Sequence, residues 1–166
     1  ATSALPLWVA ALLVAGTGAV AGSMRVTSVG LLVVVGAAAL GVGVPLVRVA
    51  LKKGPAEYGA WSLMLGASWI LVAGAAASLR AFGAADATGL RAAFLAWMPI
   101  LGAAGLGQVF VGALTYMMPV VIGGGPSAVR VGVRILEAGA PIREAARNVA
   151  AVFALAVTSL GGTSAE

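Results

Sequence analysis

The residues that could do chemistry gather in one apolar stretch, residues 91–126. It contains a single amide, Gln108, and a phenol followed by two thioethers, Tyr116, Met117 and Met118. Soft methionine sulfurs suit Cu(I), so this run could pass or hold copper. Adjacent side chains point about 100° apart on a helix, however, so two neighbouring methionines share a metal ion only if the helix unwinds. The pattern therefore favours packing or lipid contact for both methionines.

If the same stretch is helical, one of its faces carries small and polar residues. At helical spacing this face holds Gly105, Gln108, Gly112, Thr115 and Pro119, which is typical of a transmembrane helix packed against a neighbour. Gln108 has two interpretations, a contact to a substrate or cofactor and an interhelical hydrogen bond; the second is favoured. The candidate residues for helix packing or binding are Gln108, Gly112, Thr115, Tyr116, Met117, Met118 and Pro119.

Composition excludes several classes of function. The chain is 61% hydrophobic and 9% charged, whereas a soluble domain usually carries about 25% charged residues. Cysteine and histidine are both absent, which removes thiolate metal sites, most haem, zinc and copper ligation, and the usual general base at neutral pH. We predict no catalytic residue, no metal ligand and no cofactor for this chain.

The basic residues indicate membrane topology rather than nucleic-acid binding. The net charge is +5, but the ten basic residues stand singly or in short groups between apolar runs, as loop anchors do. The connections after the second and fourth apolar segments hold Arg48, Lys52, Lys53, Arg130, Arg134, Arg143 and Arg147; those after the first and third hold Arg25, Arg80 and Arg91. The positive-inside tendency predicts a cytoplasmic N-terminus. Lipid and other membrane helices or subunits are the expected partners.

The elements that must position these residues are expected to be helices. Five apolar segments are apparent, at residues 5–22, 29–51, 58–79, 91–126 and 149–160, and the first four are long enough to cross a bilayer core of about 30 Å. We predict an all-α integral membrane bundle, one domain over residues 1–166, with helices kinked at Pro45 and Pro119.

The segment 127–147 differs from the rest of the chain in its pattern of residue types. Apolar and basic residues alternate in it, which predicts an amphipathic connection that lies on the cytoplasmic leaflet; a solvated loop is the alternative. Pro141 is expected to interrupt this segment, and Glu144 and Arg147 to begin the last helix. Every acidic residue is expected in a connection or at the chain end, so no carboxylate is predicted at bilayer depth. The sequence starts without methionine and ends abruptly, so we expect it to be part of a larger chain.

Two stretches carry a resemblance to a known family. GQVFVGALTYMMPVVIGGGPSAVR, with AWSLMLGASWILVAG upstream, resembles the membrane module of polytopic bacterial proteins that bear multicopper-oxidase or cupredoxin domains, of the copper-oxidase or nitrite-reductase-like kind. The resemblance covers residues 60–130 and implies that Gln108, Tyr116 and Pro119 belong to the characteristic helix of the module. Copper-binding histidines and cysteines are missing here, so no metal site is carried over.

Three functions follow as hypotheses. The first is a non-catalytic helical module or subunit, within a copper or respiratory redox assembly. The second is a transporter or channel for ions or small molecules, with Gln108, Thr115 and Tyr116 along a path broken at Pro119. The third is an oxidoreductase core that holds haem or copper through Met117 or Met118. A water-accessible cavity at Gln108 would favour transport, and helix contact on that face would favour the module.

Overall fold

A computed structural model describes residues 4–53, 58–122 and 125–161 of the chain, and every element in these ranges is helical. The α-helices are α1 (Ala4–Val20), α2 (Met24–Ala38), α3 (Val44–Lys53), α4 (Tyr58–Ala81), α5 (Ala87–Leu95), α6 (Gly107–Ile122), α7 (Gly125–Glu137) and α8 (Ala140–Gly161). Two π-helical segments, η1 (Ala39–Gly43) and η2 (Ile100–Leu106), lie between them. The prediction of an all-α fold is confirmed.

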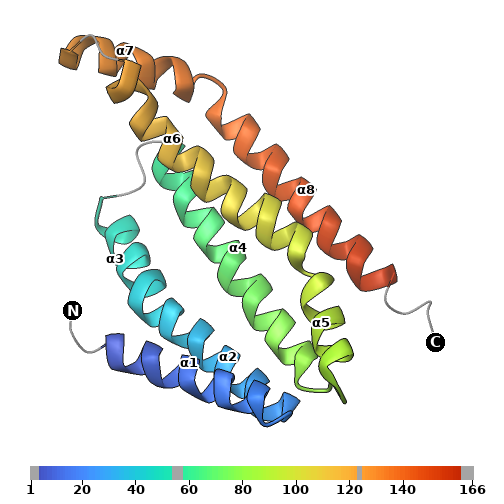
Figure 1. Cartoon of the computed structure of the whole chain (residues 1–166). Coiled ribbons are helices and arrows are strands. Elements are labelled where there is room, and N and C mark those ends of the chain that lie inside the picture. Colours follow the sequence, from blue (N-terminus) through green and yellow to red (C-terminus); the bar gives the residue numbers. More distant parts are fainter. Residues whose placement is uncertain (1–3, 54–57, 123–124, 162–166) are drawn as a thin grey trace.

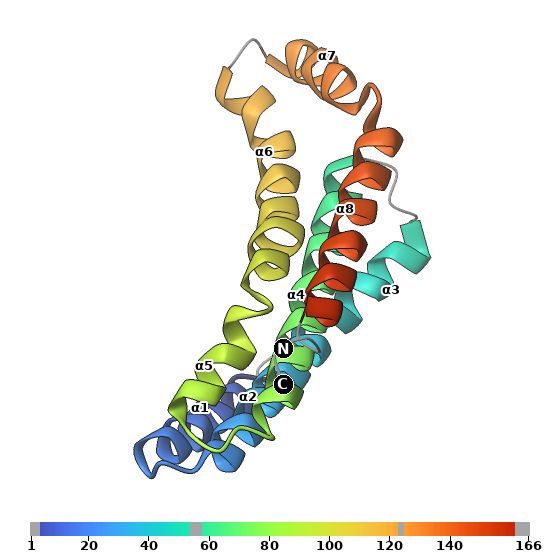
Figure 2. The ribbon, with the colours of Figure 1, turned by 90° about the vertical axis from the view of Figure 1, so that its right-hand side faces the viewer.

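Helix α4 lies at the centre of the bundle. It contacts α2 on one side and η2, α6 and α8 on the others. Helices α1 and α2 form a hairpin at one end, and α7 connects the top of α6 to α8 at the other end (Figure 1). In the perpendicular view α6 and α8 diverge toward α7 (Figure 2). The small core cluster consists of Ala73, Ile100, Ala104 and Ala151, with Trp69, Trp97, Leu101 and Leu155 packed around it.

The hairpin of α1 and α2 depends on glycine. A methyl group added to Gly30 would lie 2.4 Å from the backbone nitrogen of Ala15, and one added to Gly18 would lie 2.5 Å from that of Thr27. Gly22, in the turn, has φ of 69°, a conformation that glycine adopts without a steric penalty. Small residues therefore let the two backbones approach closely, as in membrane helix pairs.

Pro45 is accommodated by a π-turn. Proline lacks an N–H, and its ring would clash with the carbonyl four residues back, which is that of Gly41. Gly41 lies inside η1, where the chain widens and the Val44 N–H donates to the carbonyl of Ala39, five residues back. The helix consequently continues from Met24 to Lys52 as one apolar unit.

The expected fourth span is not one continuous helix. It starts with α5, capped by Asp86, whose Oδ1 accepts a 2.8 Å hydrogen bond from Gly89 N. Helix α5 ends at Leu95, four residues before Pro99, and the chain turns by 43° before η2 and α6. The break comes from Pro99, because its ring excludes the carbonyl of Leu95 from a regular helix. The sequence interpretation predicted kinks at Pro45 and Pro119 and did not predict this bend.

Fewer helices than expected have the length and apolarity to cross a membrane. Within the described ranges these are Met24–Lys52 and Tyr58–Ala81, and a third if the bent pair of α5 with η2 and α6 counts as one span. Helix α1 has 17 residues, or about 26 Å at 1.5 Å per residue, which is short of a core of about 30 Å. The predicted five segments with four full crossings are therefore not confirmed; the described residues contain two, or at most three, helices that are long and apolar enough to cross a membrane.

The last helix begins earlier than expected. Helix α8 has 22 residues and starts at Ala140, directly after Gly139, whose φ is 71°. Pro141 lies in its first turn, where a missing N–H has no cost. Residues 140–147 are thus the first two turns of α8. Glu144, which was expected to begin the last helix, lies in its second turn and is 9% exposed, because α8 packs against α4 and η2.

Candidate functional site

The contact between α4 and the η2–α6 segment is made through three glycines. A methyl group on Gly66 would lie 2.8 Å from both the Gly105 carbonyl oxygen and the Val109 nitrogen, and one on Gly112 would lie 2.8 Å from the Gly59 carbonyl oxygen. Gly105 in turn approaches Ile70. At these three glycines the backbones of the antiparallel pair are too close to leave room for a larger side chain.

Gln108 lies in this contact. It is 1% exposed, and its backbone carbonyl accepts a 3.1 Å hydrogen bond from Ser62 Oγ on α4. The side-chain amide has no hydrogen-bond partner at either Nε2 or Oε1. An interhelical hydrogen bond was expected from the amide, but the bond goes to the main chain, because the glycine contacts bring the Ser62 hydroxyl up to the backbone of α6.

The remaining predicted residues divide into two groups. Gly112 and Thr115 are buried on the same face as Gln108, and the Thr115 hydroxyl donates to the carbonyl of Val111 in its own helix, at 2.8 Å. Met117 and Met118 are 60% and 49% exposed, so neither faces the contact with α4. The side chains of Tyr116 and Pro119 lie outside the part of the chain whose side chains are described.

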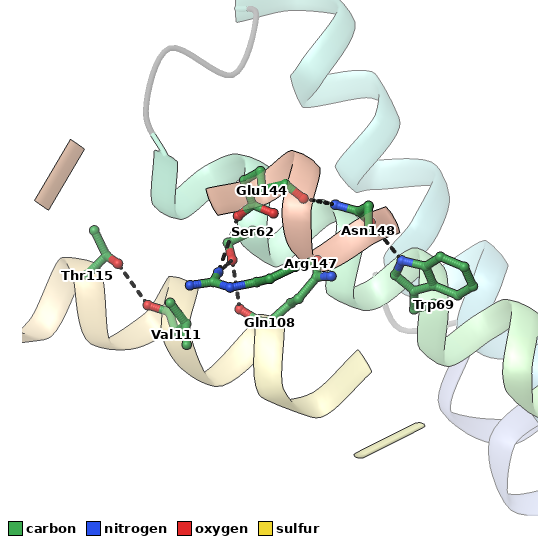
Figure 3. A network of polar contacts seen from close by, with 8 residues as sticks. All are labelled: Ser62, Trp69, Gln108, Val111, Thr115, Glu144, Arg147 and Asn148. Atoms are coloured by element: carbon green, nitrogen blue, oxygen red, sulfur yellow. Dashed lines mark hydrogen bonds and ion pairs between the residues drawn. The ribbon is translucent and has the colours of Figure 1, made fainter. Parts of the chain in front are cut away.

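A second set of polar side chains comes from α8. Trp69 Nε1 on α4 donates a 2.8 Å hydrogen bond to Asn148 Oδ1, and Asn148 Nδ2 donates to the carbonyl of Glu144, also at 2.8 Å (Figure 3). Arg147 Nη1 lies 3.7 Å from Glu144 Oε1 and 3.5 Å from Ser62 Oγ. A chain of polar contacts therefore runs from α8 through Ser62 to the backbone of α6.

An aromatic ring completes this region. The guanidinium carbons of Arg143 and Arg147 lie 5.0 Å and 5.6 Å from the centroid of the Tyr58 ring, within the range of cation–π attraction. Tyr58, Trp61, Leu65, Glu137, Ala140, Pro141 and Glu144 line a partly open cavity of about 470 Å³ between α4, the end of α7 and the start of α8.

This second set was missed by sequence reasoning. A charged pair three residues apart at the start of a helix usually indicates an exposed, solvated face. Asn148, next to that pair, carried no signal of its own, and the Trp69–Asn148 bond joins residues 79 positions apart. The sequence signal that could have found it was Trp69 itself, since a tryptophan buried between helices usually finds an acceptor for its N–H.

Neither a metal site among the described residues nor a similarity to known proteins assigns a function to the chain. Among the described residues no group of three or more histidine, cysteine, aspartate or glutamate side chains lies together. The chain matches no protein-family model, no curated protein and no solved structure. The region consists of the glycine contact between α4 and α6, the polar contacts that α8 adds to it, and a partly open cavity beside them.

We expect Gln108→Leu to raise the free energy of unfolding by about 1 kcal/mol, because leucine fills similar space without an unpaired buried amide. Thermal unfolding in detergent micelles measures the change. Ser62→Ala is the matched control on the facing helix, and it should lower the free energy by about 0.6 kcal/mol, the usual contribution of an interhelical hydrogen bond. A Gln108→Leu variant less stable than the parent would show that the amide has a partner.

Proposed function

We propose that this chain is a non-catalytic helical module of the bacterial cytoplasmic membrane, which packs against other membrane helices in a larger assembly. The observation that carries the proposal is the burial of the Gln108 face: Gln108 is 1% exposed and contacts α4 through Ser62. Gln108 is not among the residues that line the 470 Å³ cavity. A path for a transported solute along Gln108 is therefore disfavoured.

The surface supports placement in lipid. Large apolar side chains are exposed along α1 and on α8, among them Leu12, Leu13, Val149 and Phe153. A soluble monomer rarely exposes contiguous apolar surface of this kind. Trp61, in the first turn of α4, is 45% exposed and suits the boundary between headgroups and hydrocarbon.

The proposed assembly is a copper or respiratory redox complex. Its support is the resemblance of residues 60–130 to the membrane module of copper-oxidase-like bacterial proteins. Met117 and Met118 are exposed on α6, which suits contact with lipid or a partner helix. The alternative remains a transporter or channel with a path near Gln108 and Tyr116, and cysteine labelling at position 108 separates the two.

We expect a cysteine at position 108 to be protected from small water-soluble thiol reagents. The chain has no cysteine, so single-cysteine variants in inverted and right-side-out membrane vesicles report one site each. Gln108→Cys should stay unlabelled in both, because the glycine contact excludes water. Rapid labelling of Gln108→Cys would instead support the transporter.

Two exposed turn positions serve as controls and test orientation. Ala85 lies between α4 and α5, and Ala138 between α7 and α8. If the basic connections that hold Lys52 and Arg134 face the cytoplasm, Ala85→Cys should react from the outside and Ala138→Cys only from the cytoplasmic side. The reverse pattern would contradict the proposed orientation, and recovery of the chain in the soluble fraction would contradict membrane insertion.

A further inference from the structure

Two helices at one end of the bundle lie apart from the rest of it. Helix α3 ends at Lys53, shortly before α4 begins at Tyr58, and α7 connects α6 to α8 at the same end (Figure 1). Among the described residues, α3 makes more than isolated contacts only with η1, and α7 only with α6. Each of these is the segment directly before it in the chain, so much of the surface of both helices is left for something outside the chain.

The length of the helical unit Met24–Lys52 brings α3 to the headgroups in the membrane placement proposed above. The unit has 29 residues, or about 44 Å at 1.5 Å per residue, whereas a bilayer core is about 30 Å thick and needs about 20 residues. Arg25 lies in the first turn of α2, where a basic residue suits the opposite boundary of the core. Counted from Arg25, the core ends near Pro45, and α3 continues into the headgroup layer.

Helix α3 exposes a basic ridge beside an apolar ridge. Arg48 and Lys52 are exposed four residues apart, which places both on one face of the helix. Val47 and Leu51 are exposed at the same spacing, about 100° around the helix from the basic pair. Leu51 is 82% exposed, so no other helix of the described chain covers the apolar ridge.

Helix α7 repeats this arrangement. Arg130 and Arg134 are exposed one turn apart, and Val131 and Ile135 form an exposed apolar ridge next to them. Glu137, the acidic residue at the end of α7, is half-buried. The exposed charges of this helix are therefore basic, as they are on α3.

The arginines at the start of α8 are not part of this surface. Arg143 and Arg147 are half-buried, and their guanidinium groups lie over the Tyr58 ring. Of the arginines in the segment 127–147, Arg130 and Arg134 are therefore the exposed ones. The surface that can meet a membrane consists of the two ridges of α3 and the two ridges of α7.

We propose that α3 and α7 bind the headgroups of anionic phospholipids. The guanidinium groups of Arg130 and Arg134 can each donate two hydrogen bonds to one phosphate, and basic side chains near a membrane surface attract anionic lipids. The apolar ridges would contact the acyl chains. A soluble polyanion fits less well, because it would leave Leu51 and Ile135 in water. The inference rests on the proposed membrane placement, and it adds the class of lipid that the chain holds at this end.

The test measures which lipid lies next to each helix in nanodiscs that contain the full chain. The discs hold an equimolar mixture of phosphatidylglycerol, which is anionic, and phosphatidylcholine, which is zwitterionic. A bimane fluorophore on Ala138→Cys reports α7 and one on Val49→Cys reports α3, since the chain has no cysteine of its own. Brominated acyl chains quench the fluorophore on contact. The bromine is placed on one lipid or the other, so the composition of the discs stays the same.

We expect stronger quenching by brominated phosphatidylglycerol than by brominated phosphatidylcholine at both positions. The local ratio of phosphatidylglycerol to phosphatidylcholine should exceed the bulk ratio at least about fivefold, the factor expected for one basic residue near an anionic surface. Arg130→Gln combined with Arg134→Gln should return the ratio at Ala138→Cys to near the bulk value and leave the ratio at Val49→Cys unchanged.

Two further pairs of substitutions complete the comparison. Arg48→Gln combined with Lys52→Gln should have the opposite effect, a loss of the lipid preference at α3 alone. Arg25→Gln combined with Arg80→Gln removes the same charge from the start of α2 and the end of α4, where both side chains are exposed, and should change neither ratio. Circular dichroism checks that each variant is helical.

Three results would overturn the proposal. Equal quenching by the two brominated lipids at either position would overturn it for that helix and leave the basic ridge to a soluble acidic partner. A preference that survives the substitutions on the same helix, or that falls equally in the Arg25 and Arg80 variant, would show that these ridges do not select the lipid. Failure of the chain to enter the discs would contradict the membrane placement itself, whereas entry without a lipid preference leaves the packing role intact.

Discussion

Replacing Gly66 by alanine is expected to lower the free energy of unfolding by about 1–3 kcal/mol, the usual cost of overpacking a tight contact. The added methyl group would lie 2.8 Å from the Gly105 carbonyl oxygen and from the Val109 nitrogen. Both are backbone atoms, so no side chain can rotate away and the two helices must separate. The Ser62 to Gln108 hydrogen bond, 3.1 Å long, should be lost with the contact.

The matched control is Gly36→Ala in α2, where an added methyl group meets nothing within 4 Å. Alanine is a better helix former than glycine by about 1 kcal/mol, so this variant should be as stable as the parent or more stable. Thermal unfolding of both variants in the same detergent gives the comparison. Equal stability of Gly66→Ala and the parent would show that α4 and α6 do not pack as described.

Replacing Arg147 by methionine is expected to lower the free energy of unfolding by about 2 kcal/mol. The estimate lies between the roughly 3–5 kcal/mol lost on breaking a buried ion pair and the 0–1 kcal/mol of a surface pair, since the Arg147 side chain is 32% exposed and that of Glu144 is 11% exposed. Methionine keeps much of the apolar stem but leaves the Glu144 carboxylate in an apolar setting without its cation.

A double substitution separates charge from packing. Combining Arg147→Met with Glu144→Gln should recover most of the loss, because no uncompensated charge remains. Arg80→Met, at the exposed end of α4, is the control for loss of one positive charge and should change the free energy of unfolding by less than about 0.5 kcal/mol. If the double variant is no more stable than Arg147→Met alone, the pair does not account for the loss.

The helical class and the packing face of α6 could be predicted from the sequence, for a local reason. Long apolar runs rich in glycine and alanine have few alternatives to helices, and Gln108, Gly112 and Thr115 recur at the spacing of one helix face. Such spacing depends only on neighbouring residues, so it is visible without a tertiary structure.

The course of α8 and its polar contacts with α4 could not be predicted, because they depend on contacts between residues distant in the sequence. The amphipathic pattern of residues 127–147 fits a helix on a membrane surface, but the turn at Gly139 directs α8 back along α4 and buries Glu144 there. The partnership of Trp69 with Asn148 follows from that direction and has no counterpart in local periodicity. Similarly, Pro99 could be noted as a helix breaker, while the packing of η2 on α4 joins residues far apart in the sequence.

The π-turn η2 has a consequence for how this chain tolerates insertions and deletions. Each residue of an α-helix rotates the chain by about 100°, and a π-turn holds an additional residue without passing that rotation to the next turn. In η2 the Gly107 N–H donates to the Gly102 carbonyl, five residues back. Removing one residue there converts the π-turn to an α-turn and keeps Gly112 directed at α4. Removing one residue within α6, upstream of Gly112, rotates that glycine away, so η2 is the point at which this helix absorbs a change of length.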